Sequence, residues 1–168
     1  MISEAFLGEF DHEMAKTRES LSRITDDKFG WKPHAKSMSM GALAGHIAQF
    51  PIWAKMTMLT PQFDVAPVGG QPMPQPELKN REQILAFFDQ NLPGARAAIA
   101  ATGDRAMMEP WALLSAGKPI FSMPRVAVLR GMVMNHLIHH RAQLGVYLRL
   151  NDIPVPAIYG PSADEGSM

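Results

Sequence analysis

Two histidines in the C-terminal half of the chain have the spacing of a metal-binding pair. His136 and His140 are four residues apart, so on a helix both imidazoles lie on the same side and can bind one metal ion. Neutral imidazoles need no compensating charge before the ion arrives, and binding of the ion offsets the cost of burying the rings. At about 100° per residue, the apolar face of the same helix coincides with the pair. That face comprises Leu129, Val133, Leu144 and Tyr147.

His46 is the candidate for a third ligand. It lies beside Leu43 and Ile47, at the edge of the apolar stripe of an earlier helix. Three histidines from two facing helices would leave at least one coordination position open for water or substrate, as in catalytic metal sites. The alternative interpretation, for His46 and for the pair, is a buried core histidine whose hydrogen bonds are satisfied.

The other three histidines are interpreted differently. His139 falls at about 300° from His136 on the helical circle, away from the apolar face. His12 and His34 are interpreted as surface or hydrogen-bonding residues. His139, Arg141 and Gln143 are near enough in sequence to contact the ligands, but the sequence does not select among them.

Four helices are expected to position these residues. The apolar spacing predicts a first helix over residues 3–25 and a second from Ser37 or Ser39 to about Met58. Pro51 should kink or break the second helix one turn after His46. Asn80, with Gln83 three residues later, has the capping-box pattern at the start of a third helix. The last helix is predicted from about Ser122 or Pro124 to Asn151.

These elements predict an all-α protein, a four-helix bundle with long connections after helices 2 and 3. The connection over residues 61–76 is rich in proline and glycine, and residues 102–123 are expected to be a second irregular connection without strands. The first connection is long enough to cross the bundle, so helices 2 and 3 can run parallel. We expect one domain over residues 1–168, in which residues 152–168 form an extended tail.

Composition excludes several function classes. The chain has 168 residues, 46% hydrophobic and 19% charged, which is typical of a globular protein. Its net charge is zero, which disfavours nucleic acid as a partner, and it contains no cysteine, so disulfides and thiolate ligands are excluded. The longest uncharged run, residues 37–54, is too polar for a membrane span. The start of the chain is acidic, unlike a signal peptide, so we expect a cytoplasmic protein.

Three segments resemble the DinB family, also called DinB/YfiT-like. They are "SMSMGALAGHIAQFPIWAKMT" around His46, "MNHLIHHRAQLGVYLRL" around His136 and His140, and "IPVPAIYGPSADE" near the end. The resemblance spans nearly the whole chain and does not concern the DNA polymerase of the same name. It implies an up-down-down-up bundle, a homodimer, and a divalent metal, nickel or zinc, bound by His46, His136 and His140.

Some relatives within the resembled family are transferases or isomerases that use a low-molecular-weight thiol. The leading hypothesis is therefore a metal-dependent enzyme of the thiol S-transferase or hydrolase type, acting on a small-molecule substrate. With no cysteine in the chain, any sulfur on the metal would have to come from the substrate. The alternative is a non-catalytic stress-response protein that binds a ligand or partner and uses the metal structurally. A third interpretation is haem ligation by His46 and one of the pair.

Overall fold

The computed structural model of the protein describes residues 1–71 and 76–166. Its helices are α1 (Ile2–Ser22), α2 (Met40–Ala48), α3 (Phe50–Leu59), α4 (Arg81–Ala101), α5 (Asp104–Met108), α6 (Arg125–Val128) and α7 (His136–Leu150). A 3-10 turn, η1 (Asp26–Lys28), follows α1, and a π-helical segment, η2 (Leu129–Asn135), joins α6 to α7. The strands are β1 (Gln62–Asp64), β2 (Pro110–Ser115) and β3 (Lys118–Pro124).

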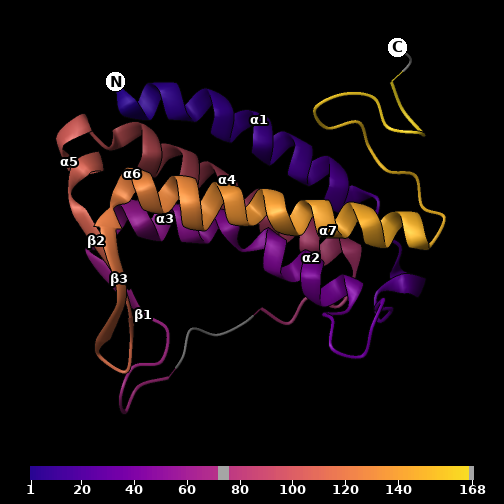
Figure 1. Ribbon diagram of the computed structural model, residues 1–168, viewed down its shortest axis with the longest axis horizontal. Coiled ribbons are helices and arrows are strands. Elements are labelled where there is room, and N and C mark those ends of the chain that lie inside the picture. Colours follow the sequence, from indigo (N-terminus) through magenta and orange to yellow (C-terminus); the bar gives the residue numbers. More distant parts are fainter. Residues whose placement is uncertain (72–75, 167–168) are drawn as a thin grey trace.

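Four helical stretches form most of the molecule. In Figure 1, α1 and the stretch from α6 to α7 run in one direction, whereas α2 with α3, and then α4, run back. None of the described helices is long and apolar enough to cross a membrane. The chain is mostly helical, as predicted, but the predicted four-helix bundle is confirmed only in part, because the structure adds α5 and three strands to these stretches.

Local signals set the helix ends as expected. The backbone N–H of Ala42 donates to the Ser39 hydroxyl at 3.2 Å, so Ser39 caps α2. Asn80 caps α4 by accepting from the Gln83 N–H at 2.9 Å. The second predicted helix is broken where Pro51 requires it, because α2 ends at Ala48 and Pro51 lies in the first turn of α3.

The prediction of an all-α protein is wrong in one region. Residues 102–123 contain α5 and a β-hairpin, and the three strands form one sheet in the order β1-β2-β3. β2 and β3 are antiparallel, with Ser115 opposite Lys118, while β1 lies parallel to β2. The hairpin turn is Ala116-Gly117, with φ of 51° and 75°, which is the left-handed geometry that matches the twist of a two-residue hairpin.

Two apolar clusters stabilise the fold. The larger one fills the space between the helices and includes Phe10, Met14, Leu43, Ile47, Phe88, Ile99, Leu137 and Leu144. The smaller one joins the sheet to the helices through Trp111, Leu113 and Val128, with Trp53 packed against it. Figure 1 shows the sheet at one end of the molecule, beside α3 and α6.

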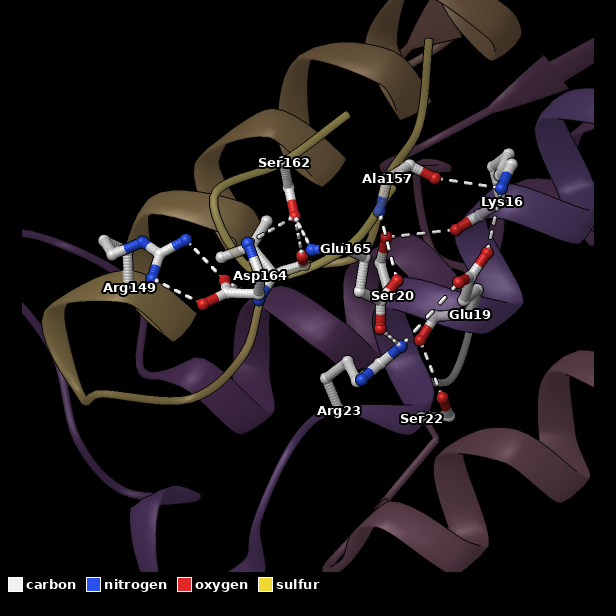
Figure 2. A network of polar contacts seen from close by, with 11 residues as sticks. Lys16, Glu19, Ser20, Ser22, Arg23, Arg149, Ala157, Ser162, Asp164 and Glu165 are labelled. Atoms are coloured by element: carbon white, nitrogen blue, oxygen red, sulfur yellow. Dashed lines mark hydrogen bonds and ion pairs between the residues drawn. The ribbon is translucent and has the colours of Figure 1, made fainter. Parts of the chain in front are cut away.

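The C-terminal tail is an irregular chain that folds back onto α1 and α7. Figure 2 shows its polar contacts: Arg149 of α7 pairs with Asp164, and Arg23, which directly follows α1, pairs with Glu165. Lys16 donates to the carbonyl oxygen of Ala157 at 2.9 Å. The tail is therefore attached to both the first and the last long helix.

Candidate metal centre

The three predicted ligands come together in the structure. His46 lies in the last turn of α2, His136 is the first residue of α7, and His140 follows one turn later. One ring nitrogen of each lies within 4.8 Å of the others. Ring centroids are 4.7 Å apart for His46 and His140, 4.7 Å for His136 and His140, and 5.2 Å for His46 and His136.

The packing of α2 against α7 sets this geometry. Leu43 and Ile47 flank His46 in sequence and are fully buried, as are Leu137 and Leu144 on α7. The Tyr147 hydroxyl donates to the carbonyl oxygen of Met38 at 3.3 Å and fixes α7 relative to the start of α2. The histidines therefore lie at the edge of a rigid apolar contact, which reduces the reorganisation needed to bind an ion.

Burial keeps two of the rings neutral. Loss of solvent, followed by the proximity of His140 and His136, lowers the pKa of His46 to about 4. The same two causes, burial and then His140, lower the pKa of His136, while a hydrogen bond with the Met132 backbone acts in the opposite direction. Neutral imidazole is the form that binds a metal ion, so both residues are ready to act as ligands at neutral pH.

A glutamine orients the third ligand. The Oε1 atom of Gln143 lies 2.7 Å from Nδ1 of His140, and an amide oxygen can only accept a hydrogen bond. Nδ1 therefore carries the proton, and Nε2 of His140 has a free lone pair for the ion. The Nε2 atom of Gln143 lies 3.1 Å from Nε2 of His139, so His139 accepts a hydrogen bond and holds the amide in this orientation.

The contacts of the other histidines and of Arg141 show that none of them belongs to the ligand cluster. His139 is exposed and lies outside the three-histidine cluster, as its helical angle predicted. Arg141 points away from the cluster into a buried ion pair with Glu13. His34 is exposed, and its Nδ1 accepts from the Lys36 N–H at 3.2 Å, whereas the ring of His12 stacks on Tyr159.

An apolar cavity adjoins the cluster, and the sequence analysis did not predict it. It has a volume of about 70 Å³, and His46 and His136 form part of its wall. Phe50 is another wall residue and packs edge-on against both ligands, with ring centroids 5.3 Å from His46 and 5.0 Å from His136. The remaining wall comes largely from the sheet and the helices beside it: Trp53, Trp111, Leu113, Phe121 and Val128.

His46 also borders a second, more open space. This groove has a volume of about 480 Å³ and is lined by Gly45, Gln49 and Leu78, among others. Its lining is more polar than that of the apolar cavity. The cluster therefore lies between a small apolar cavity and a more open groove through which water or a polar molecule can reach His46.

Comparisons with known proteins agree with this fold. The sequence matches the DinB family over residues 1–167. The chain belongs to the DinB family. It is 27% identical to the uncharacterized protein YrdA of Bacillus subtilis over 163 residues, which covers 95% of this chain and 89% of that protein. The resemblance inferred from the three sequence segments is thereby confirmed.

Two solved structures of DinB-like proteins share the fold. One, from Bacillus cereus, superimposes with a TM-score of 0.70 at 22% identity and covers 93% of this chain and 97% of its own. The other, YjoA from Bacillus subtilis, has a TM-score of 0.67 at 20% identity and covers 89% and 94%. At these identities the likeness concerns the fold, so the chemistry has to be argued from this chain's own residues.

The donor set fits a divalent metal ion. Three imidazoles within reach of one point, two of them with a lowered pKa, suit zinc, nickel, copper or iron, which accept nitrogen ligands. They fit magnesium or calcium poorly, because those ions prefer oxygen ligands. The three-histidine group can therefore hold a metal ion of the first kind.

Proposed function

We propose that this DinB family member is a metal-dependent enzyme of the thiol S-transferase or hydrolase type. His46, His136 and His140 hold the ion, with nickel or zinc as the first candidates, and the substrate is a small molecule, with a low-molecular-weight thiol as the leading candidate. The observation that carries the proposal is the convergence of three ligand nitrogens within 4.8 Å beside an apolar cavity. Three protein ligands leave a position for a substrate atom.

The chain's own residues supply binding, orientation and exclusion of water. A bound divalent ion would lower the pKa of a thiol or water at the open position, so no separate strong base is needed. Among the described residues lining the apolar cavity, only His46 and His136 are titratable. Phe50, Trp53 and Trp111 keep water away from that side, which strengthens electrostatic interactions at the ion.

Metal content of purified variants tests the site. His140→Ala removes one ligand, and we expect the protein to lose most of its bound metal, measured by elemental mass spectrometry against protein concentration. His34→Ala is the matched control, because His34 is exposed and outside the cluster, and it should keep the wild-type metal content. Stoichiometric metal in His140→Ala would show that the site is misassigned.

A second candidate function is structural. The three ligands connect α2 with α7, so a bound ion would also tie these two helices together. If the metal serves mainly to stabilise a ligand- or partner-binding protein, chelation should lower the melting temperature strongly. Because Leu43, Ile47 and Leu144 already pack these helices together, the enzymatic proposal predicts only a modest decrease.

A further inference from the structure

The apolar cavity beside the histidines is built from two parts of the fold. Phe50, Trp53 and Val128 contribute the helical side, and β2 and β3 contribute Trp111, Leu113 and Phe121. Trp111 is 1% exposed and Val128 is 2% exposed, so these walls belong to the packed interior. The sheet that sequence analysis missed therefore forms one side of a cavity whose wall also includes two metal-ligand candidates.

Two polar groups in this wall are already engaged. The Thr57 hydroxyl donates to the carbonyl oxygen of Trp53 at 2.8 Å. The indole N–H of Trp111 donates to the Thr60 hydroxyl at 3.3 Å. Both protons are therefore used within the protein, and a hydroxyl oxygen entering the cavity would lose its hydration without finding a free donor on Thr57 or Trp111. An alkyl group has no such hydration to lose.

The size of the cavity limits its occupant. An apolar cavity of about 150 Å³ holds benzene. The 70 Å³ found here is about half of that, which fits a short branched alkyl group and excludes a sugar or a peptide. Any bulky polar part of the same molecule would have to lie in the open groove on the other side of His46.

We propose that the cavity binds a compact branched alkyl group, of about three or four carbon atoms, attached directly to the substrate atom at the metal's open position. This assignment rests on the proposed function, because it places the substrate's reacting atom at the three-histidine centre. It defines the substrate class as small molecules with a short branched aliphatic group next to a metal-binding atom. Trp111, Phe121 and Val128 are the residues that determine specificity.

The test uses two thiols of equal heavy-atom count. The full chain is loaded with Co²⁺, whose visible absorption reports coordination by the protein, and is titrated with 2-propanethiol and with 2-mercaptoethanol. The thiolate-to-cobalt charge-transfer band gives each dissociation constant, which is corrected to the thiolate form. We expect 2-propanethiol to bind about 10- to 100-fold more tightly, because its branched carbon group is wholly apolar, whereas 2-mercaptoethanol is unbranched and carries a hydroxyl that would lose its hydration in the cavity.

Three variants test whether the preference for 2-propanethiol arises in the cavity. Val128→Phe fills the cavity and should reduce the preference for 2-propanethiol by about tenfold while leaving the cobalt spectrum unchanged. Phe121→Ala enlarges the cavity and should shift the preference toward thiophenol. Ile120→Ala is the matched control, because Ile120 is the neighbour of Phe121 on β3, does not line the cavity and is 57% exposed.

The outcomes separate the two proposals. If Co²⁺ gives no protein-dependent visible bands, the metal centre is wrong, and the proposed function and the cavity assignment are both overturned. If the bands form but the two thiols bind equally well, only the cavity assignment is overturned. Loss of the preference in Ile120→Ala, or its retention in both cavity variants, would likewise overturn the assignment.

Discussion

At the scale of single residues, the contacts of His140 explain why its ring adopts the tautomer that can bind a metal ion. The Nδ1–H of His140 donates a hydrogen bond to the Oε1 atom of Gln143, whose amide N–H donates in turn to His139. Such hydrogen bonds fix the ring and raise its basicity as a ligand. His139 is therefore not a ligand, but it belongs to the chain of contacts that prepares one.

Replacing Gln143 should weaken metal binding without changing the ligands. Gln143→Leu removes the acceptor for the His140 Nδ1 proton, and we expect the dissociation constant for Zn²⁺ to rise about 10- to 100-fold. Gln143→Glu restores an acceptor and should recover most of the affinity. Competition with a chromophoric chelator measures both constants. Equal affinities for wild type and Gln143→Leu would show that the hydrogen bond does not support the ligand.

The lowered pKa of His46 predicts a specific pH dependence for the metal-free protein. Its pKa is 6.5 in the unfolded chain and about 4 in the folded chain. As the pH falls below 6.5, the unfolded state binds a proton that the folded state does not, so the contribution of His46 to stability is complete above that pH. It is lost progressively between pH 6.5 and about 4.

Urea denaturation with a chelator present, at several pH values, measures this effect. The control is His46→Gln, in which the titrating group is absent while all other acid-sensitive groups remain. The difference in the free energy of unfolding between wild type and variant should change in favour of the variant as the pH falls from 7 to 4. Parallel pH profiles for the two proteins would contradict the lowered pKa.

At the scale of elements, the helices and the histidine cluster could be predicted because their determinants are local. Ser39 and Asn80 cap helices where the sequence indicated, and Pro51 ends the regular course of α2. His136 and His140 both lie within α7, so the assumption of about 100° per residue holds for the pair. The π-helical turn of η2 precedes them and does not disturb their spacing.

The sheet and the cavity could not be predicted because their determinants are distant in sequence. Pro110, Pro119 and Pro124 resemble loop signals, yet each lies within or at the end of a strand in this small sheet. The partner of β2 on its other side is β1, which follows α3. Only the alternation of Trp111 with Leu113 and of Phe121 with Met123, around Ala116-Gly117, could have indicated the hairpin.

At the scale of the whole molecule, a buried ion pair joins helices that are far apart in sequence. Arg141 of α7 lies 2.6 Å from Glu13 of α1, and their side chains are only 4% and 6% exposed. The Tyr159 hydroxyl, from the tail, contacts both carboxylate oxygens of Glu13 at 2.9 Å. Residues from three distant segments therefore meet at the buried Glu13 carboxylate. Its negative charge must be neutralised by Arg141 for the fold to be stable.

Replacing one partner of this ion pair should be more destabilising than replacing both. Arg141→Met leaves the Glu13 carboxylate buried without its partner, and we expect a loss of about 3–5 kcal/mol in the free energy of unfolding, measured with urea. The double variant Glu13→Leu/Arg141→Met should recover most of that loss. Arg149→Met, which breaks the more exposed pair with Asp164, should have a much smaller effect. Equal losses for Arg141→Met and Arg149→Met would contradict the assigned role of the buried pair.

The same ion pair sets an order of events during synthesis. Glu13 of α1 leaves the ribosome more than a hundred residues before its partners Arg141 and Tyr159. The metal-ligand cluster likewise needs His136 and His140, which are synthesised after His46. A nascent chain that stops short of α7 thus carries an acidic side chain it cannot bury favourably and a metal centre with one ligand. The buried pair and the three-histidine cluster can therefore form only after α7 has been synthesised.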